Sequence, residues 1–273
     1  MLLWDGLQVA IPAGMEPVTL DRGFIRLAGL DDGSVDLRFG AEKSRFSPER
    51  DGRRILRAAG MGAERLLPCD QTWAGSLPGP LYFASRLFVL RFGQTRGLVA
   101  MLFPAPPRPD LLQPLCRSLA WVPATQWRSW SCYDIAFETP PGYLLHQAAF
   151  RQGLFRLQFR KGGALLVFER LAPADVLLDG QPLRSRFERF LPAGARRGYD
   201  MVAGGDREIV ISRRSGPFGR LLARLGLRAG TGHGLIRHVV EANRLLILTE
   251  EGAPLPETDR QRLQASYAVT PTY

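Results

Sequence analysis

Cysteine and histidine are scarce in this chain, with three of each among 273 residues. Cys69, Cys116 and Cys132 form no Cys-x-x-Cys pair, which excludes a zinc knuckle and a dithiol redox motif. We expect three buried or half-buried free thiols. His233 and His238 are five residues apart, a spacing that directs them to opposite faces of a strand. The sequence therefore predicts neither a metal site nor a cofactor.

Long apolar runs are also missing. No window approaches the roughly 18 consecutive apolar residues that a membrane-spanning helix needs. The start, Met1–Asp5, has no basic region and reaches an acidic residue at once, unlike a secretory signal. We therefore expect a cytoplasmic protein with no transmembrane segment.

Lysine is nearly absent although the formal net charge is +10, because Lys43 and Lys161 are the two lysines among 36 basic residues. An excess of arginine over lysine along the whole chain can result from codon composition as well as from selection for phosphate contacts. The arginines are spread along the chain and form no long basic tail. Nucleic acid is therefore a weaker interpretation than a protein partner, and an anionic membrane surface is weaker still.

Clusters typical of catalysis are not visible. The glycine-rich segment Gly230–Gly234 is expected between a helix and a strand, the reverse of the order around a phosphate-binding loop. Ser215-Gly216 lacks the surroundings of a nucleophile elbow. Carboxylates such as Asp134, Glu138 and Glu169 are scattered, and no pair can be assigned acid and base roles. We predict that the chain is not an enzyme.

What the chain does contain is a repeated pattern. Leu7–Gly14 (LQVAIPAG) is followed by Gly23–Leu27 (GFIRL), and Ile135–Gly142 (IAFETPPG) is followed by Gly153–Leu157 (GLFRL). Trp4 precedes the first copy and Trp130 the second. The pattern predicts two related domains in tandem, residues 1–122 and 130–273.

The ends of the two halves also show a likeness. Ser85–Leu90 (SRLFVL) is similar to Asn243–Leu248 (NRLLIL), and each run leads to a proline-containing bend and a helix. Val122–Ser129 is the predicted joint.

Alternating apolar residues predict half-buried strands in both halves. In the second half, Phe155, Leu157 and Phe159 should be buried, and Arg156 and Arg160 should face solvent. Capping residues and apolar stripes predict several helices. The expected fold class is α+β, with each repeat an antiparallel sheet packed against helices. The first helix is expected from Ser47 to near Gly60 or Gly62. The others are expected at Asp110–Leu119, Pro173–Leu178, Leu183–Leu191, Pro217–Arg228 and Asp259–Tyr267.

One stretch resembles a known superfamily. Arg86–Arg91, Gly97–Leu102 and the leucine-rich helix after Asp110 are similar to the end of bacterial members of the PsbP-like α/β/α superfamily. The order of elements in each half is similar too. The resemblance brings no catalytic motif. It implies a non-enzymatic accessory or chaperone-like protein that binds other proteins.

The densest positive region surrounds the predicted helix Pro217–Arg228. Arg220 and Arg224 lie one turn apart, opposite an apolar stripe that includes Leu221 and Leu225. The plain alternative is a solvated face over a core stripe. The functional interpretation is docking onto an acidic protein partner, with nucleic acid or an anionic membrane surface as the alternative. The predicted contact residues are Arg213, Arg214, Arg220, Arg224 and Arg228.

Overall fold

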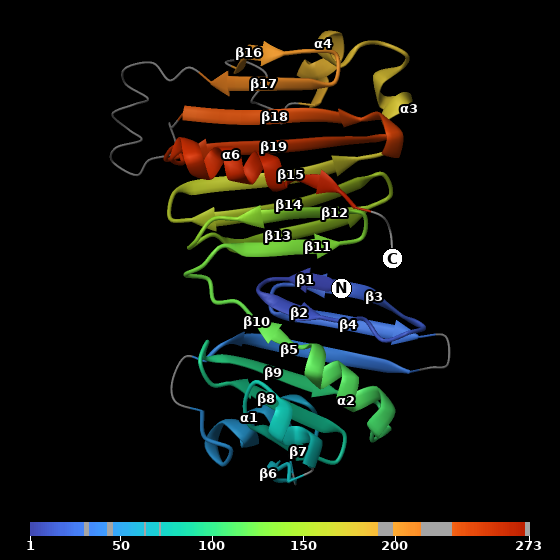
Figure 1. Ribbon diagram of the computed structural model, residues 1–273, viewed down its shortest axis with the longest axis vertical. Helices are drawn as coiled ribbons and strands as arrows, with labels where there is room; N and C mark the ends of the chain where they lie inside the picture. Colours follow the sequence, from blue (N-terminus) through green and yellow to red (C-terminus); the bar gives the residue numbers. More distant parts are fainter. Residues whose placement is uncertain are drawn as a thin grey trace. The chain divides into compact units, whose positions relative to one another are not determined.

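The computed structural model describes residues 1–29, 33–42, 46–62, 64–70, 72–190, 199–213 and 231–270 (Figure 1). The chain divides into two compact units, Met1–Ser131 and Cys132–Tyr273. The domains predicted from the sequence are residues 1–122 and 130–273. The division after Ser131 therefore falls slightly later than the predicted joint, Val122–Ser129. No helix among the described residues is long and apolar enough to cross a membrane.

The first unit is built on a seven-stranded sheet in which all neighbouring strands are antiparallel. A meander of three consecutive strands is extended at one edge by strands from later in the unit. From one edge to the other the order is β3 (Met15–Asp21), β4 (Phe24–Gly29), β5 (Ser34–Ala41), β9 (Gly97–Leu102), β8 (Leu87–Phe92), β7 (Leu81–Ala84) and β6 (Leu67–Pro68).

The second unit is built on another seven-stranded antiparallel sheet. Here too a meander of three strands is extended by strands from later in the chain. The order is β13 (Leu144–Arg151), β14 (Leu154–Lys161), β15 (Ala164–Leu171), β19 (Arg244–Gly252), β18 (Thr231–Val239), β17 (Glu208–Arg213) and β16 (Tyr199–Gly204).

The two sheets therefore have the same strand order, with β3 to β9 corresponding in turn to β13 to β19 (Figure 1). Details of register agree as well. Gly23, before β4, has a positive φ, and its carbonyl accepts a hydrogen bond from the Phe39 amide. Gly153, before β14, has the same conformation and accepts from the Ala172 amide. A Cβ atom at either glycine would meet a backbone oxygen, at 2.8 Å and 2.6 Å, which explains why glycine occupies both places.

Each unit also has short paired strands outside its large sheet. In the first, β2 (Leu7–Val9) pairs with β10 (Ala120–Trp121), and β2 also pairs with β1 (Leu2–Trp4), which in turn pairs with β11 (Arg128–Cys132). In the second, β12 (Ile135–Thr139) pairs with β20 (Ala268–Val269).

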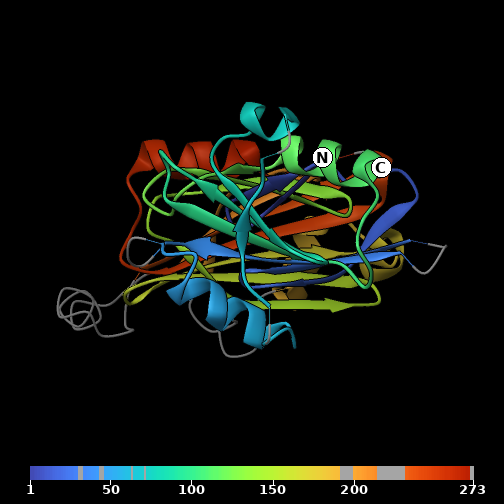
Figure 2. The ribbon, with the colours of Figure 1, turned by 90° about the horizontal axis from the view of Figure 1, so that it is seen from below.

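Helices lie on both faces of the first unit's large sheet. Figure 2 shows α1 (Arg50–Ala58) on one side and α2 (Pro109–Ser118) and η1 (Thr72–Ser76) on the other. In the second unit α3 (Ala174–Leu178), α4 (Leu183–Arg186) and η2 (Phe187–Phe190) pack on one face through an apolar cluster. The remaining elements are η3 (Val240–Ala242) and α6 (Glu257–Ser266).

The register predicted for the strand Phe155–Phe159 is confirmed. Phe155, Leu157 and Phe159 are at most 2% exposed, whereas Arg160 is exposed and Arg156 is partly exposed. Alternation of apolar and charged residues therefore identified the buried face of β14 correctly.

The predicted α+β class is wrong. Strands make up 47% of the structure and helices 20%, so the molecule is mainly β, with large antiparallel sheets. The helices fall near their predicted places but are short, and α1 and α2 have nine and ten residues. Each of the described helices is short enough to cover only part of a sheet face. The α/β/α architecture implied by the PsbP-like resemblance is therefore wrong too.

The correspondence predicted between Ser85–Leu90 and Asn243–Leu248 is also wrong. These segments contribute to β8 and β19. In strand order β8 corresponds to β18, and β19 corresponds to β9. Neighbouring strands of a buried hairpin have similar compositions, so a short apolar run does not distinguish them.

Candidate functional site

The face of the first unit's sheet that carries α1 is only partly covered. Leu56 on α1 packs into an apolar cluster with Leu87, Val89, Phe46 and Leu66. Gly52 faces the same cluster, because a Cβ atom there would lie 2.9 Å from Leu66 Cδ1. The helix is thereby held toward the β8 side of the sheet.

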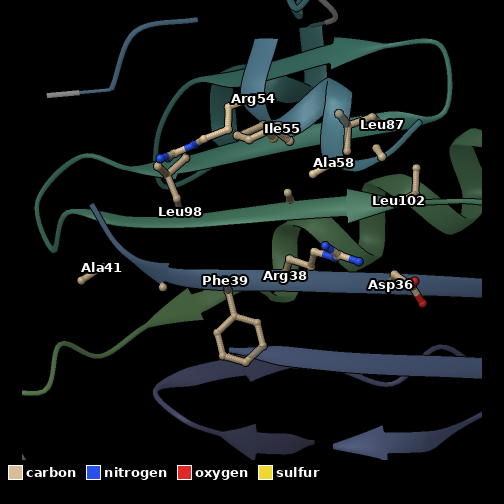
Figure 3. Close-up of a pocket in the computed structure, with 14 residues that line it drawn as sticks. Asp36, Arg38, Phe39, Ala41, Arg54, Ile55, Ala58, Leu87, Leu98 and Leu102 are labelled. Carbon is tan, nitrogen blue, oxygen red and sulfur yellow. The ribbon is translucent and has the colours of Figure 1, made fainter. Parts of the chain in front are cut away.

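Beyond this contact, an apolar groove runs between α1 and the strands β5, β9 and β8. Its volume is about 260 Å³. Leu98, Ala100 and Leu102 of β9 form its floor and are only partly buried. Ile55 and Ala58 line it from α1, and Figure 3 shows both on the side of the helix that faces the strands. We call this site the α1 groove, lined by Asp36, Arg38, Phe39, Gly40, Ala41, Arg54, Ile55, Ala58, Ala59, Leu87, Val89, Leu98, Ala100 and Leu102.

Alternation along the strands explains why the groove floor is apolar. Val99 and Met101 of β9 are fully buried on the other face of the sheet, where Cys116 of α2 approaches Met101 with 3.9 Å between the sulfur atoms. Successive side chains of a strand point to opposite faces, so Leu98, Ala100 and Leu102 point into the groove. Strand β9 is thus apolar on both faces, but only one face is closed.

A row of arginines borders the α1 groove. Arg50, Arg53, Arg54 and Arg57 follow the i, i+3, i+4, i+7 spacing of one helix face, and all four are exposed. They surround a surface hollow of about 500 Å³ together with Glu49. We call these four residues the arginine face. In Figure 3 the Arg54 side chain extends from α1 toward Leu98, so the arginine face meets the groove at this residue.

One carboxylate within α1 offsets part of this charge. Asp51 lies 3.1 Å from Arg50 and 4.0 Å from Arg54. The hydrogen bond from Arg50, followed by that from the Ser47 amide, lowers the pKa of Asp51. Arg53 and Arg57 have no ion-pair partner among the described residues. The arginine face therefore keeps a net positive charge.

Charges at the strand side of the groove are arranged differently. Asp36 accepts hydrogen bonds from Arg26 on β4, at 2.6 and 2.7 Å, which fixes its carboxylate. Arg38 is exposed and lies 5.8 Å from the Phe24 ring centroid, with no carboxylate partner in the part of the chain that the structure describes. Nearby, the buried Glu42 is paired with Arg91 at 3.3 Å. The groove is thus apolar at its floor and positive at Arg38 and Arg54.

Of the contact residues predicted from the sequence, Arg213 alone lies within the described structure. Arg213 is the last residue of β17 and is paired in register with Gly232 of β18. Arg214, Arg220, Arg224 and Arg228 lie outside the described residues, as does the predicted helix Pro217–Arg228. The spacing of Arg50, Arg53, Arg54 and Arg57 is a comparable signal in the sequence, because it places four arginines on one face of the predicted helix after Ser47.

Charged groups elsewhere are engaged in structural pairs. Asp134 lies 2.8 Å from both Arg170 and Arg244. Glu138 pairs with Arg262 at 2.6 Å, and Glu169 pairs with Arg156. No group of three or more possible metal ligands occurs within the described ranges. These carboxylates therefore connect neighbouring strands and helices.

Two of the three thiols are shielded from water, and His233 is partly buried. Cys116 and Cys132 are buried, and Cys69 is half-buried, as expected for free cysteines. Burial raises the pKa of Cys116 to about 12 and raises that of Cys132 further. Desolvation, and then the positive charge of Arg260, lowers the pKa of His233. A thiol with a raised pKa is a poor nucleophile, because the thiolate is the reactive form.

Comparisons with known proteins do not place the chain in a family. No family model matches it, and no curated protein matches it. Among solved structures it is similar to the apo structure of the immunity protein TplEi of T6SS from Pseudomonas aeruginosa, with 13% sequence identity and a TM-score of 0.29. That similarity covers 97% of this chain and 100% of the other. A TM-score this low does not establish a shared fold.

Proposed function

We propose that the chain is a non-catalytic, cytoplasmic protein-binding or assembly protein, and that the α1 groove and the arginine face form its contact surface. The observation that carries the proposal is the position of Arg54, which lines the groove and belongs to the arginine face. Apolar anchor residues bordered by arginine are typical of protein interfaces. The partner would present aliphatic side chains to the groove and carboxylates to the arginines.

The lining of the groove supports a protein partner. Sites for small molecules and cofactors usually carry a few convergent polar groups that fix the orientation of the ligand. The α1 groove is lined mainly by aliphatic side chains, which suit the apolar side chains of another protein. Its polar lining groups come from Asp36, Arg38 and Arg54, and the Asp36 carboxylate is already held by Arg26.

Nucleic acid or an anionic membrane is the second class of partner that the charge suggests. Phosphate contacts need basic side chains along a path, and single strands need exposed aromatic rings for stacking. The floor of the α1 groove is aliphatic, at Leu98, Ala100 and Leu102. An aliphatic floor matches a protein side chain better than a phosphate backbone.

Site-specific photo-crosslinking tests this proposal. A benzophenone amino acid replaces Ala58, which is exposed and lines the groove, and in a matched control it replaces Val18 of β3, which is 54% exposed and outside the groove lining. After irradiation in nuclease-treated lysate of the source cells, we expect a discrete protein adduct from position 58 and none from position 18. Arg53→Glu with Arg57→Glu should weaken that adduct, because reversing two charges repels an acidic partner.

Two outcomes would overturn the proposal. Equal adducts from positions 58 and 18 would mean that the capture is non-specific. An adduct in untreated lysate that disappears after nuclease treatment, with no protein adduct remaining, would assign the arginine face to nucleic acid.

A further inference from the structure

The second unit shows what covers the equivalent of the α1 groove. Register identifies the matching residues, since Ala100 pairs with Arg38 of β5 and Leu245 pairs with Leu171 of β15. Two residues further along β9 and β19, Leu102 pairs with Asp36, and Ile247 pairs with Glu169.

Asp36 and Glu169 occupy the same place in their sheets. Asp36 is opposite Arg26 and ion-paired with it, and Glu169 is opposite Arg156 and ion-paired with it. This shared cross-strand pair fixes the correspondence, so Ala100 is equivalent to Leu245 and Leu102 to Ile247.

The burial of these equivalent residues differs between the units. Leu245 is 0% exposed and Ile247 is 1% exposed, whereas Ala100 and Leu102 are only partly buried. In the second unit this face is covered by α3, α4 and η2. Ala174 and Leu178 of α3, Leu183 of α4 and Phe190 of η2 are buried in the same apolar cluster as Leu245 and Ile247.

Strand β15 leads directly to α3, and two hydrogen bonds hold the start of that helix. The Ala174 amide donates to the Asn243 carbonyl at 3.1 Å, and the Asp175 amide donates to Asn243 Oδ1 at 2.8 Å. In the first unit, the helix that follows β5 is α1, and its buried Leu56 packs against Leu87 and Val89 of β8. Over Leu98, Ala100 and Leu102 it leaves the open α1 groove.

We infer that the α1 groove binds an acidic amphipathic helix of a partner protein, which takes the place that α3 takes in the second unit. The inference rests on the proposed function and names its ligand class. Ala174 and Leu178 are four residues apart, so one face of α3 contributes both apolar side chains to this cover, beside Leu183 and Phe190. An apolar helix face set into a groove is a recurring mode of peptide recognition.

Charge specifies the polar face of that helix. Arg38 at the strand side and Arg54 at the helix side leave positive charge on both borders of the groove. Glutamate or aspartate beside the apolar anchors would pair with these arginines. A second copy of this chain fits poorly, because it would bring the same arginine face and a net charge of +10 to the contact.

The probe for this inference is a fluorescein-labelled, end-capped peptide of about 16 residues, long enough to populate a helix. It contains leucine at i, i+4 and i+8 and alanine and glutamate elsewhere. A second peptide has every glutamate replaced by lysine. A third has the sequence of the first, except that two central alanines are replaced by proline, which prevents helix formation. Binding to the full-length protein is measured by fluorescence anisotropy at low and physiological salt.

We expect the glutamate peptide to bind, with weaker binding at higher salt because ions screen the arginines over about 8 Å. The lysine and proline peptides should each bind at least about tenfold more weakly. Ala100→Phe fills the groove and should weaken binding of the glutamate peptide by a similar factor, and Ala100→Ser is the matched control of nearly equal volume. Arg38→Glu, at an exposed position, tests the border charge without altering the floor.

Each result has one meaning. Equal binding of the glutamate and proline peptides would refute a helical ligand and indicate an extended one. Failure of the glutamate peptide to bind, while position 58 still crosslinks a protein, would overturn this inference and leave the proposed function standing. If the glutamate peptide fails to bind and position 58 also gives no protein adduct, both this inference and the proposed function are overturned. Concentration-dependent dimerisation in light scattering, abolished by Ala100→Phe, would assign the groove to a second copy of the chain.

Discussion

Phe159 is a residue whose contribution to stability follows directly from its contacts. It is 0% exposed, and its ring centroid lies 5.8 Å from that of Phe137 and 5.7 Å from that of Phe168, both in edge-to-face geometry. Tyr267 completes the cluster at 5.2 Å from Phe168. We predict that Phe159→Ala lowers the free energy of unfolding by about 3–5 kcal/mol, because it removes buried surface and leaves a cavity. Urea titration followed by circular dichroism measures the loss.

Phe150 provides the control for this substitution. It lies on the neighbouring strand β13 and contacts Phe155 with 4.8 Å between ring centroids, but it is 36% exposed. Phe150→Ala should therefore cost much less than Phe159→Ala. Equal losses would show that the register assigned to β14 is wrong.

The sequence predicted which side of β14 is buried, but it could not predict the α1 groove. In β14 apolar residues alternate with charged ones, so one face is marked. In β9, the run from Leu98 to Leu102 is apolar at every position, and a pattern of period two then cannot say which face is closed. Whether Ala100 is covered depends on where α1 sits, and that is set by Gly52 and Leu66.

Two helices end with the same interaction. Ser118, the last residue of α2, accepts a hydrogen bond from the Ala10 amide at 3.0 Å and donates to the Leu115 carbonyl at 2.8 Å. Ser266, the last residue of α6, accepts from the Glu138 amide at 3.0 Å and donates to the Leu263 carbonyl at 2.9 Å. Ser118 therefore connects α2 to Ala10, which follows β2. Ser266 connects α6 to Glu138, which lies within β12.

We predict that Ser118→Ala and Ser266→Ala each lower the free energy of unfolding by about 1 kcal/mol, because each leaves a backbone amide without its partner. Thermal unfolding of the two variants beside the unsubstituted protein is the measurement. Ser185→Ala is the matched control, since Ser185 is exposed and bonds only a carbonyl three residues away. A loss at one of the two helix ends and none at the other would mean that the two contacts are not equivalent.

Most elements were predictable because their signals are local. The helices α1, α2, α3 and α6 lie close to their predicted ranges, and so do the meander strands around Phe24–Leu27 and Phe155–Phe159. Pairings between distant segments were not. Strand β5 pairs with β9, about sixty residues later, so residue patterns within either strand carry little information on that pairing. This is why β8 and β19 were matched to each other.

At the scale of the whole molecule, the error in fold class came from counting elements without weighing their extent. The predicted helices that fall within the described residues are present, but the longest have ten residues, while β18 and β19 have nine each within one sheet of seven strands. Sheet area dominates such a structure. The arginine-rich segment after β17, to which the sequence assigned partner binding, contributes no described residue beyond Arg213.

The last prediction concerns the origin of the two units in a duplication. An experimental structure should superpose the first large sheet on the second with the strands in the same order, from β3 on β13 to β9 on β19. The Cα atoms of Gly23, Arg26 and Asp36 should then fall on those of Gly153, Arg156 and Glu169. The short strands supply an independent check, because Leu7 pairs with Trp121 and the corresponding Ile135 pairs with Val269. Two sheets can share an order by chance, but a shared glycine turn, ion pair and strand register are unlinked features. If the best superposition required a shift of even one residue, side chains would exchange faces, and the equivalence of Ala100 with Leu245 would fail together with the duplication.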